Sequence, residues 1–326
     1  MTLKLYDNED IGISREKTCC SLDDVEDARS VACKLGIPFY VLNFSDSFKS
    51  EVVNRFVNTY KCGGTPNPCI DCNRYIKFDK LMLRAKQLDF DYVVTGHYAN
   101  VEYDSAAERY LLKKAVDSTK DQSYVLYSMT QELLSKTLFP LGNLKKTEVR
   151  ELALENDFIN AKKHDSQDIC FVKDGDYAKF IEDYSGEKFD KGSFVDTKGN
   201  KIGEHKGIIH YTIGQRKGLG LSFPKPMFVC SKDISDNTVT LGEESKLYTN
   251  ELDANDINLI AYSSIEKPMR LKAKVRYKQE EQWATVEQTD SNHLHLKFDL
   301  PQRAIAKGQA VVLYDSDTVV GGGTIV

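Results

Sequence analysis

Two short, almost wholly apolar runs constrain the fold most. Residues 38–44 (Pro-Phe-Tyr-Val-Leu-Asn-Phe) and 92–95 (Tyr-Val-Val-Thr) are patterned as strands buried on both faces, which occur almost only in parallel sheets covered by helices. Helix-period apolar residues lie between them, over 48–60 and 73–88, and a further helical pattern covers 22–35. This alternation predicts an α/β domain with a parallel sheet in the first part of the chain. Further along, the pattern predicts a hairpin over 99–113, a helix after residue 123 and a charged amphipathic helix over about 145–156.

Gly96 and His97 follow the second apolar run directly. Ligands of open parallel sheets bind at the carboxyl ends of the strands, so these two residues mark a candidate site. A histidine in this place is equally consistent with a purely structural side chain whose hydrogen bonds are satisfied.

The residue pattern changes twice in the rest of the chain. Residues 164–240 are punctuated by glycines and predict a small α+β domain, whereas residues 241–326 alternate apolar and polar side chains in short segments. Short strands separated by turn residues are typical of a small β-barrel. We therefore expect three domains, over 1–163, 164–240 and 241–326.

Composition narrows the class of protein. The 326 residues are 41% hydrophobic, no apolar run is long enough to cross a bilayer, and no secretory signal is visible. Eight cysteines in such a chain indicate the reducing cytoplasm, where cysteine clusters serve catalysis or metal binding. The net charge of −5 argues against a wholly basic nucleic-acid binder but leaves room for local basic strips.

Residues 65–73 (Thr-Pro-Asn-Pro-Cys-Ile-Asp-Cys-Asn) combine two prolines with a Cys-x-x-Cys. The prolines predict a stiff loop, and the helical pattern from Asn73 places Cys72 at a helix N-terminus, where a thiolate is stabilised. Cys69 and Cys72 are also compatible with a zinc half-site, a thioredoxin-like pair or structural cysteines. Zinc needs two more ligands at suitable spacing, and only Cys62 lies near, so we expect no metal site.

Two further features are candidates for catalysis or phosphate binding. Cys170 follows a polar loop and is a candidate second thiol, although a cysteine in an apolar run is more often part of the core. Basic residues alternate from Arg270 to Lys278 and would share one face of a strand. Five like charges on one face repel each other unless an anion neutralises them, which favours phosphate contact over a solvated barrel face.

Taken together, these segments resemble the tRNA-specific 2-thiouridylase family, a branch of the PP-loop ATP pyrophosphatases. The resemblance covers essentially the whole chain and runs in the family's order. It is carried by 65–73 with Ile76-Lys77-Phe78, 95–98 (Thr-Gly-His-Tyr), 120–124 (Lys-Asp-Gln-Ser-Tyr), 165–171 (Asp-Ser-Gln-Asp-Ile-Cys-Phe), 211–220 (Tyr-Thr-Ile-Gly-Gln-Arg-Lys-Gly-Leu-Gly) and 321–323 (Gly-Gly-Gly).

The resemblance implies that sulfur replaces the 2-oxygen of the wobble uridine of tRNA. ATP, with Mg²⁺, adenylates the uridine, a persulfide on Cys170 received from a donor protein supplies sulfur, and Cys72 releases it, leaving a transient disulfide. Gly96 and Leu3 match positions near ATP, with Leu3 where the family usually has Met. The positions that match tRNA contacts are Asn67, Pro68, Cys69, His97, Lys120, Asp121, Gln122, Arg276, Tyr277 and Gln309. An everted uridine could be received by the Pro-Asn-Pro loop.

One family motif has no counterpart. The Ser-Gly-Gly-x-Asp-Ser type of phosphate loop after the first strand is absent, and no Gly-Gly pair precedes Gly63-Gly64. We expect a PP-loop domain lacking about one strand–loop–helix, with apolar strand edges exposed beside the gap. A start site placed too late explains this better than a functional short form, because the flanking strands are still patterned for burial.

Three hypotheses follow. The first is an ATP-dependent tRNA uridine 2-sulfurtransferase, cytoplasmic and without membrane contact. The second is a catalytically inactive tRNA-binding remnant that keeps the barrel and the basic strand. The third is a metal or redox protein that uses Cys62, Cys69 and Cys72. Retention of both Cys72 and Cys170 in matching motifs favours the first.

Overall fold

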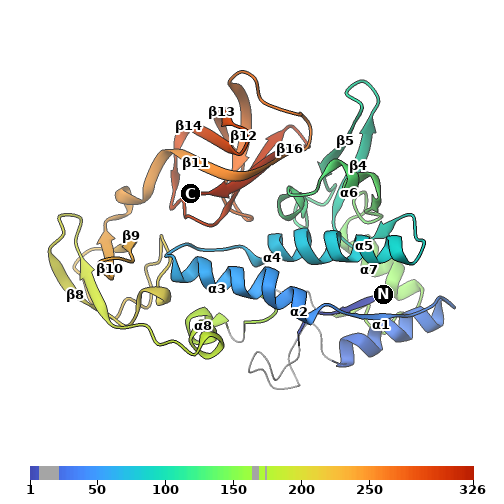
Figure 1. Ribbon diagram of the computed structural model, residues 1–326, viewed down its shortest axis with the longest axis horizontal. Coiled ribbons are helices and arrows are strands. Elements are labelled where there is room, and N and C mark those ends of the chain that lie inside the picture. Colours follow the sequence, from blue (N-terminus) through green and yellow to red (C-terminus); the bar gives the residue numbers. More distant parts are fainter. Residues whose placement is uncertain (7–21, 164–168, 173–174) are drawn as a thin grey trace.

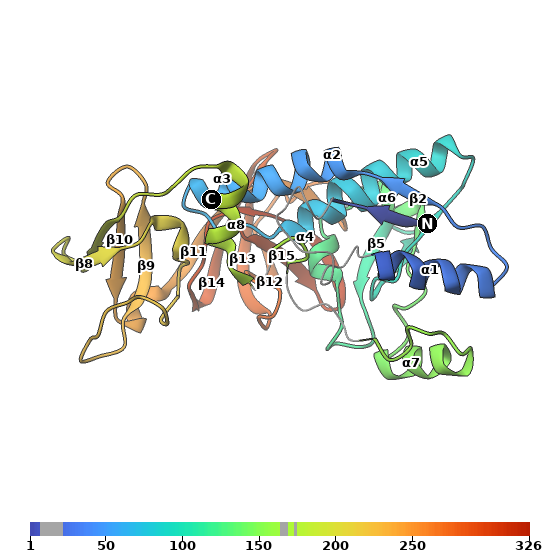
Figure 2. The same ribbon diagram turned by 90° about the horizontal axis from the view of Figure 1, so that it is seen from below.

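A computed structural model describes residues 1–6, 22–163, 169–172 and 175–326. Three bodies are visible in Figure 1: a helical and parallel-stranded domain, a β-barrel above it, and a smaller β domain at one end. Figure 2 shows the smaller domain at the opposite end of the molecule from α1 (Leu22–Lys34) and α7 (Lys146–Glu155). The α/β, α+β and β-barrel classes expected from the sequence are confirmed.

The described parallel strands of the first domain form two separate pairs. β1 (Thr2–Lys4) pairs with β2 (Val41–Asn43), and β3 (Val93–Val94) pairs with β6 (Thr137–Leu138). The expectation that both apolar runs are buried on both faces is wrong: Val41 is 44% exposed and Val94 is 60% exposed. The physical reason is that no described strand joins the two pairs, so each keeps an edge that the apolar pattern would otherwise cover.

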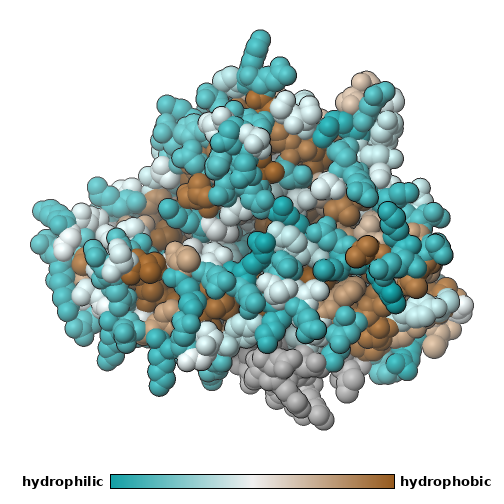
Figure 3. All heavy atoms as spheres, in the orientation of Figure 1, coloured by the Kyte–Doolittle hydropathy of each residue, from teal (hydrophilic) through white to brown (hydrophobic). Residues whose placement is uncertain are grey.

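Apolar side chains reach the surface around the first pair. Figure 3 shows brown atoms at the lower right, over the region of α1 and β2. The exposed large apolar residues here are Leu35, Ile37 and Tyr40, between α1 and β2, and Val41 of β2. The uncovered strand edges expected beside the missing phosphate loop remain a prediction.

Two long helical runs lie beneath the barrel (Figure 1). The first consists of α2 (Ser45–Phe48), a π-helical segment (Lys49–Val53) and α3 (Asn54–Lys61). The second consists of α4 (Pro68–Asp71), a π-helical segment (Cys72–Lys80) and α5 (Leu81–Gln87). Buried Phe48, Phe56 and Ile76 pack these runs into one hydrophobic cluster, which also holds Phe171. None of the helices in the described ranges combines the length and apolar character that a membrane span needs.

The barrel is closed by pairing of its first and last strands. It consists of β11 (Tyr248–Leu259), β12 (Met269–Lys274), β13 (Gln282–Asp290), β14 (His293–Arg303), β15 (Ala310–Asp315) and β16 (Thr318–Ile325), with β11 bonded to β16. The expected hairpin of the first domain, β4 (Ala99–Asp104) and β5 (Arg109–Lys114), continues this sheet, because Val319 of β16 pairs with Leu112. The barrel and the first domain thus share one hydrogen-bonded sheet.

The central domain contains α8 (Tyr177–Ser185) and a four-stranded sheet in the order β8-β7-β10-β9. These strands are β7 (Gly192–Val195), β8 (Lys201–His205), β9 (Phe228–Asp233) and β10 (Thr238–Gly242). The helix expected after residue 123 is shorter than its apolar pattern suggests: a 3-10 turn (Ser123–Leu126) precedes α6 (Gln131–Ser135), whose cap is Thr130. The three domain boundaries remain a prediction.

Candidate functional site

The cysteine helix begins earlier than the sequence predicts. The side chain of Asn67 accepts a hydrogen bond from the backbone N–H of Cys69 at 3.2 Å, and Pro68 occupies the first helical position. Cys69 is therefore the exposed cysteine of the first turn, whereas Cys72 lies one turn further along and is only 9% exposed. The expectation that Cys72 stands at a helix N-terminus is wrong, because an asparagine cap and a proline start the helix at residue 68.

Cys170 lies against the same hydrophobic cluster that contains Cys72. The Tyr6 hydroxyl donates to the Cys170 carbonyl at 2.9 Å, and the neighbouring Phe171 is fully buried against Phe48 and Phe56. These contacts anchor the Cys170 backbone beside the helical runs. The polar residues 165–168 of this motif lie outside the described residues.

Asp71 lies between Cys69 and Cys72 in sequence, and its carboxyl group is largely removed from water. Burial raises the pKa of its carboxyl group to about 6, although the positive charges of Arg55 and Arg74 pull the pKa in the opposite direction. Arg74 is itself held by Asp256 of the barrel, with N–O distances of 2.5 and 3.2 Å. The helix that carries both cysteines is therefore tied to the barrel by an ion pair.

His97 is enclosed by aromatic rings. It is 7% exposed, its ring lies 5.8 Å from Phe78 and 5.9 Å from Phe139, and its Nδ1 lies 2.8 Å from the Thr95 hydroxyl. Burial, with help from the charge of Lys77, lowers the pKa of His97 to about 3, so the ring is neutral at pH 7. This environment fits the structural interpretation of His97, and its contact with tRNA remains a prediction.

The two positions that match ATP contacts, Gly96 and Leu3, lie at the parallel strands of the first domain. A phosphate cradle needs consecutive backbone N–H groups where a strand passes into a helix. Gly96 follows β3, and among the protein's atoms a Cβ at this position would meet only Leu141, at 3.7 Å. Leu3 lies in β1 opposite Leu42. The residues after β1, 7–21, are outside the described ranges, and we assign no step to the phosphates.

The motif from Lys120 to Gln122 shapes its own loop. Asp121 accepts hydrogen bonds from the Ala115 backbone N–H at 3.0 Å and the Ser123 hydroxyl at 2.8 Å. Gln122 accepts from the backbone N–H of Tyr98 at 3.0 Å. The Tyr277 hydroxyl reaches across from the barrel and donates to the Asp121 carbonyl at 2.9 Å.

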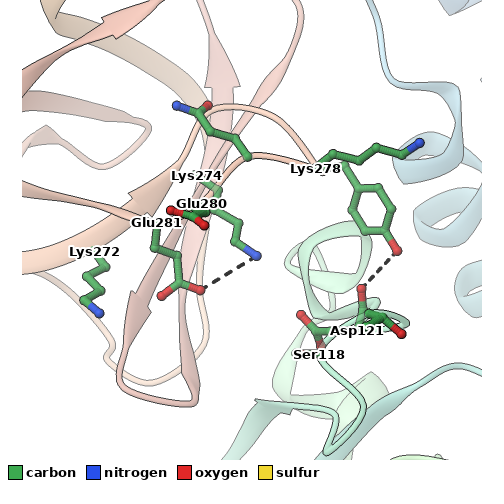
Figure 4. Close-up of a pocket in the computed structure, with 10 residues that line it drawn as sticks. Ser118, Asp121, Lys272, Lys274, Lys278, Glu280 and Glu281 are labelled. Carbon is green, nitrogen blue, oxygen red and sulfur yellow. Dashed lines mark hydrogen bonds and ion pairs between the residues drawn. The ribbon is translucent and has the colours of Figure 1, made fainter. Parts of the chain in front are cut away.

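A cleft of about 700 Å³ separates this loop from the barrel. Figure 4 shows Ser118 and Asp121 on one side and Lys272, Lys274 and Glu281 on the other. Glu281 binds Lys274 at 3.7 Å and, outside the cleft lining, Lys114 of β5 at 2.6 Å. The cleft is thus a polar groove with lysines at its barrel side. Its other lining residues are Thr119, Tyr277, Lys278, Gln279 and Glu280.

Two of the five basic residues, Arg270 and Lys274, are paired with carboxylates within the protein, which weakens the reason for expecting phosphates along all of the strand. Arg270 forms a two-pronged ion pair with Asp299, at 2.8 and 2.6 Å, and Lys274 faces Glu281. The strand ends at Lys274, so Arg276 and Tyr277 lie beyond the regular alternation. Arg276 donates to the Ala304 carbonyl at 2.6 Å, inside the protein.

Comparisons with known proteins decide the family. A family model described as the tRNA methyl transferase HUP domain matches residues 1–174, more than half of the chain. The matching PRC-barrel domain covers 178–243, and an aminomethyltransferase β-barrel domain covers 249–325. A tRNA-specific 2-thiouridylase MnmA of Clostridioides difficile is 51% identical over 325 residues, covering 100% of this chain and 90% of that protein. The chain belongs to the tRNA-specific 2-thiouridylase family.

Other members of the 2-thiouridylase family are equally similar. The MnmA of Acetivibrio thermocellus is 53% identical, over 95% of this chain and 86% of its own length. MnmA 1 of a Thermoanaerobacter species is 52% identical, over 100% of this chain and 90% of its own length.

Three features of the site in this member of the 2-thiouridylase family are not among those expected from the sequence. The start of the cysteine helix could have been found, since Asn-Pro is a recognised cap and first-turn pair. The raised pKa of Asp71 and the link from Glu281 to Lys114 had no local signal, because both depend on residues distant in the chain. In the described ranges, no group of three or more His, Cys, Asp and Glu side chains is arranged to hold a metal ion.

Proposed function

We propose that this chain transfers sulfur to the 2-position of a tRNA uridine, with Cys72 and Cys170 as the sulfur-handling thiols. The observation that carries the proposal is that Cys72 is buried in a hydrophobic cluster against which Cys170, 98 positions further along the sequence, also packs. The shared name of the relatives, tRNA-specific 2-thiouridylase, supports the same reaction.

The sulfur chemistry needs two thiols in sequence. The terminal sulfur of a Cys170 persulfide forms the new bond to C2 of the activated uridine, and the activated oxygen leaves. The Cys72 thiolate then attacks Sγ of Cys170 and breaks the S–S bond, so that 2-thiouridine departs with the electron pair. A Cys72–Cys170 disulfide remains, and an external thiol reductant restores both cysteines.

The further components belong to the same proposal. ATP, when bound, would supply the activation of the uridine oxygen, and the HUP match over residues 1–174 supports this use. A persulfide-carrying protein reloads Cys170. The tRNA lies along the polar cleft, which is lined by Lys272 and Lys278 of the barrel and by Asp121 of the first domain, and the uridine reaches the loop before Cys69.

A mass-spectrometric assay tests the proposal. Reduced protein is incubated with unmodified tRNA, ATP and a persulfide donor, and digested tRNA is searched for 2-thiouridine. Product is expected with the wild-type chain and ATP, and background levels with Cys72→Ser or Cys170→Ser. Cys33→Ser, which changes an exposed cysteine of α1, is the matched control and should retain activity.

A second candidate function is a tRNA-binding protein without turnover. It is favoured by one observation: the described parallel strands of the first domain stand as two separate pairs. Binding of tRNA without product in the assay above, under conditions where a full-length relative is active, would support this alternative and contradict sulfur transfer by this chain.

A further inference from the structure

The loop before the cysteine helix is held by a turn of the barrel. The Thr65 backbone N–H donates to the Lys307 carbonyl at 2.7 Å. In return, the Gln309 side-chain amide donates to the Thr65 carbonyl at 2.8 Å and the Pro66 carbonyl at 3.2 Å. Three hydrogen bonds thus join segments that lie 244 positions apart in sequence.

Local sequence makes this loop dependent on outside donors. Pro66 and Pro68 have no N–H, so this part of the chain has two fewer backbone donors with which to hold itself in place. The barrel turn approaches closely because it contains Gly308, whose φ is +85°. A Cβ at this position would lie 2.7 Å from the Thr59 methyl group and 3.3 Å from the Thr65 nitrogen. The packing therefore favours glycine there.

The held carbonyls stand directly before the functional residues. Pro66 is followed by Asn67, whose side chain caps the helix, and Cys69 lies in the first turn of that helix. A shift of the Thr65 and Pro66 carbonyls therefore moves the cap and the start of the cysteine helix together.

We propose that Gln309 is a positioning residue that fixes the cysteine loop from the barrel. Its amide supplies both N–H donors to the loop, so it acts through the backbone of Thr65 and Pro66. This role differs from the tRNA contact that the family resemblance implies for Gln309. Its consequence for catalysis rests on the proposed sulfur transfer, whereas its effect on the loop does not.

The first test uses the protein without RNA. Gln309→Leu keeps the size of the side chain and removes both donors. Gln288→Leu is the matched control: Gln288 also joins two backbone groups, Ile265 N–H at 2.8 Å and the Asp290 carbonyl at 3.0 Å, but only within the barrel. Hydrogen exchange of a peptide covering residues 63–70 is expected to be roughly tenfold faster in Gln309→Leu and unchanged in Gln288→Leu.

The second test separates positioning from RNA contact. In the thiolation assay, Gln309→Leu is expected to lower kcat about tenfold while KM and the Kd for tRNA change less than about twofold. Gln309→Glu, which places a carboxylate against two carbonyls, should give the same pattern. Unchanged exchange of residues 63–70, or a weakened tRNA affinity with normal exchange, would overturn the positioning role.

The two proposals fail in different ways. If even the wild-type chain makes no 2-thiouridine, the proposed sulfur transfer fails, and hydrogen exchange alone decides the positioning role. If product forms and Gln309→Leu exchanges like the wild type, only the positioning role fails.

Discussion

Replacement of Asp71 by asparagine should stabilise the protein at neutral pH and have much less effect in acid. Burial raises the pKa of this carboxyl from 3.8 to about 6, so ionisation is unfavourable in the folded state. Because the folded pKa is raised, ionisation of Asp71 lowers the free energy of unfolding as pH rises from about 4 to about 6. Above that range its destabilising contribution stays constant. The neutral amide of an asparagine side chain would mimic the protonated acid at every pH.

The magnitude follows from the shift. At 1.36 kcal/mol per pKa unit, the gain of Asp71→Asn is at most about 3 kcal/mol at pH 7.5 and about 1 kcal/mol at pH 4.5. Denaturant unfolding at both pH values measures it. The contrasting variant is Asp256→Asn, which removes the partner of Arg74 and should not stabilise at either pH.

An equal effect of Asp71→Asn at both pH values would refute this reasoning. So would a loss of stability at pH 7.5, because it would mean that attraction to Arg55 and Arg74 outweighs burial.

Three other predictions follow from the structure. Because the buried His97 resists protonation, the free energy of unfolding should fall as pH drops below about 6.5, by up to about 1.4 kcal/mol per pH unit. The free energy of unfolding of His97→Gln should depend less on pH between 7.5 and 5. Trp283 is the chain's single tryptophan, and its ring lies 5.5 Å from the ammonium of Lys272, which lines the cleft. The fluorescence of Trp283 should therefore change when tRNA binds, and the binding should weaken at higher salt. Unchanged emission despite binding would argue against RNA in the cleft. The Glu281 side chain is 12% exposed and is paired with two lysines, Lys114 and Lys274. Glu281→Gln should therefore lower the free energy of unfolding by about 2 kcal/mol, as measured by denaturant unfolding. Glu280→Gln, on the same turn, should leave the free energy of unfolding nearly unchanged.

Local patterns predicted the class of each domain. The hairpin over 99–113, the helix near 145–156 and the barrel all depend on periodicity or turn residues close in sequence, and all are present. The apolar pattern from Asn73 misplaces the start of the cysteine helix, because two prolines so close together are typical of a loop, whereas the cap and first-turn rules favour a helix at Asn67-Pro68.

Long-range pairings could not be predicted in this way. Arg270 is neutralised by Asp299, which lies two strands away, and this depends on the register of β12, β13 and β14. The hold of Gln309 on the loop likewise depends on how the barrel docks. A single sequence shows which residues are charged or polar, but not which partner the fold brings to each.

The proposed sulfur transfer requires Cys72 and Cys170 to react in turn with the same persulfide. A single turnover without external reductant, followed by peptide mapping, tests it most directly. We predict a disulfide-linked pair of peptides containing Cys72 and Cys170, in an amount equal to the 2-thiouridine formed. Formation of 2-thiouridine with both cysteines still recovered as thiols would contradict the account.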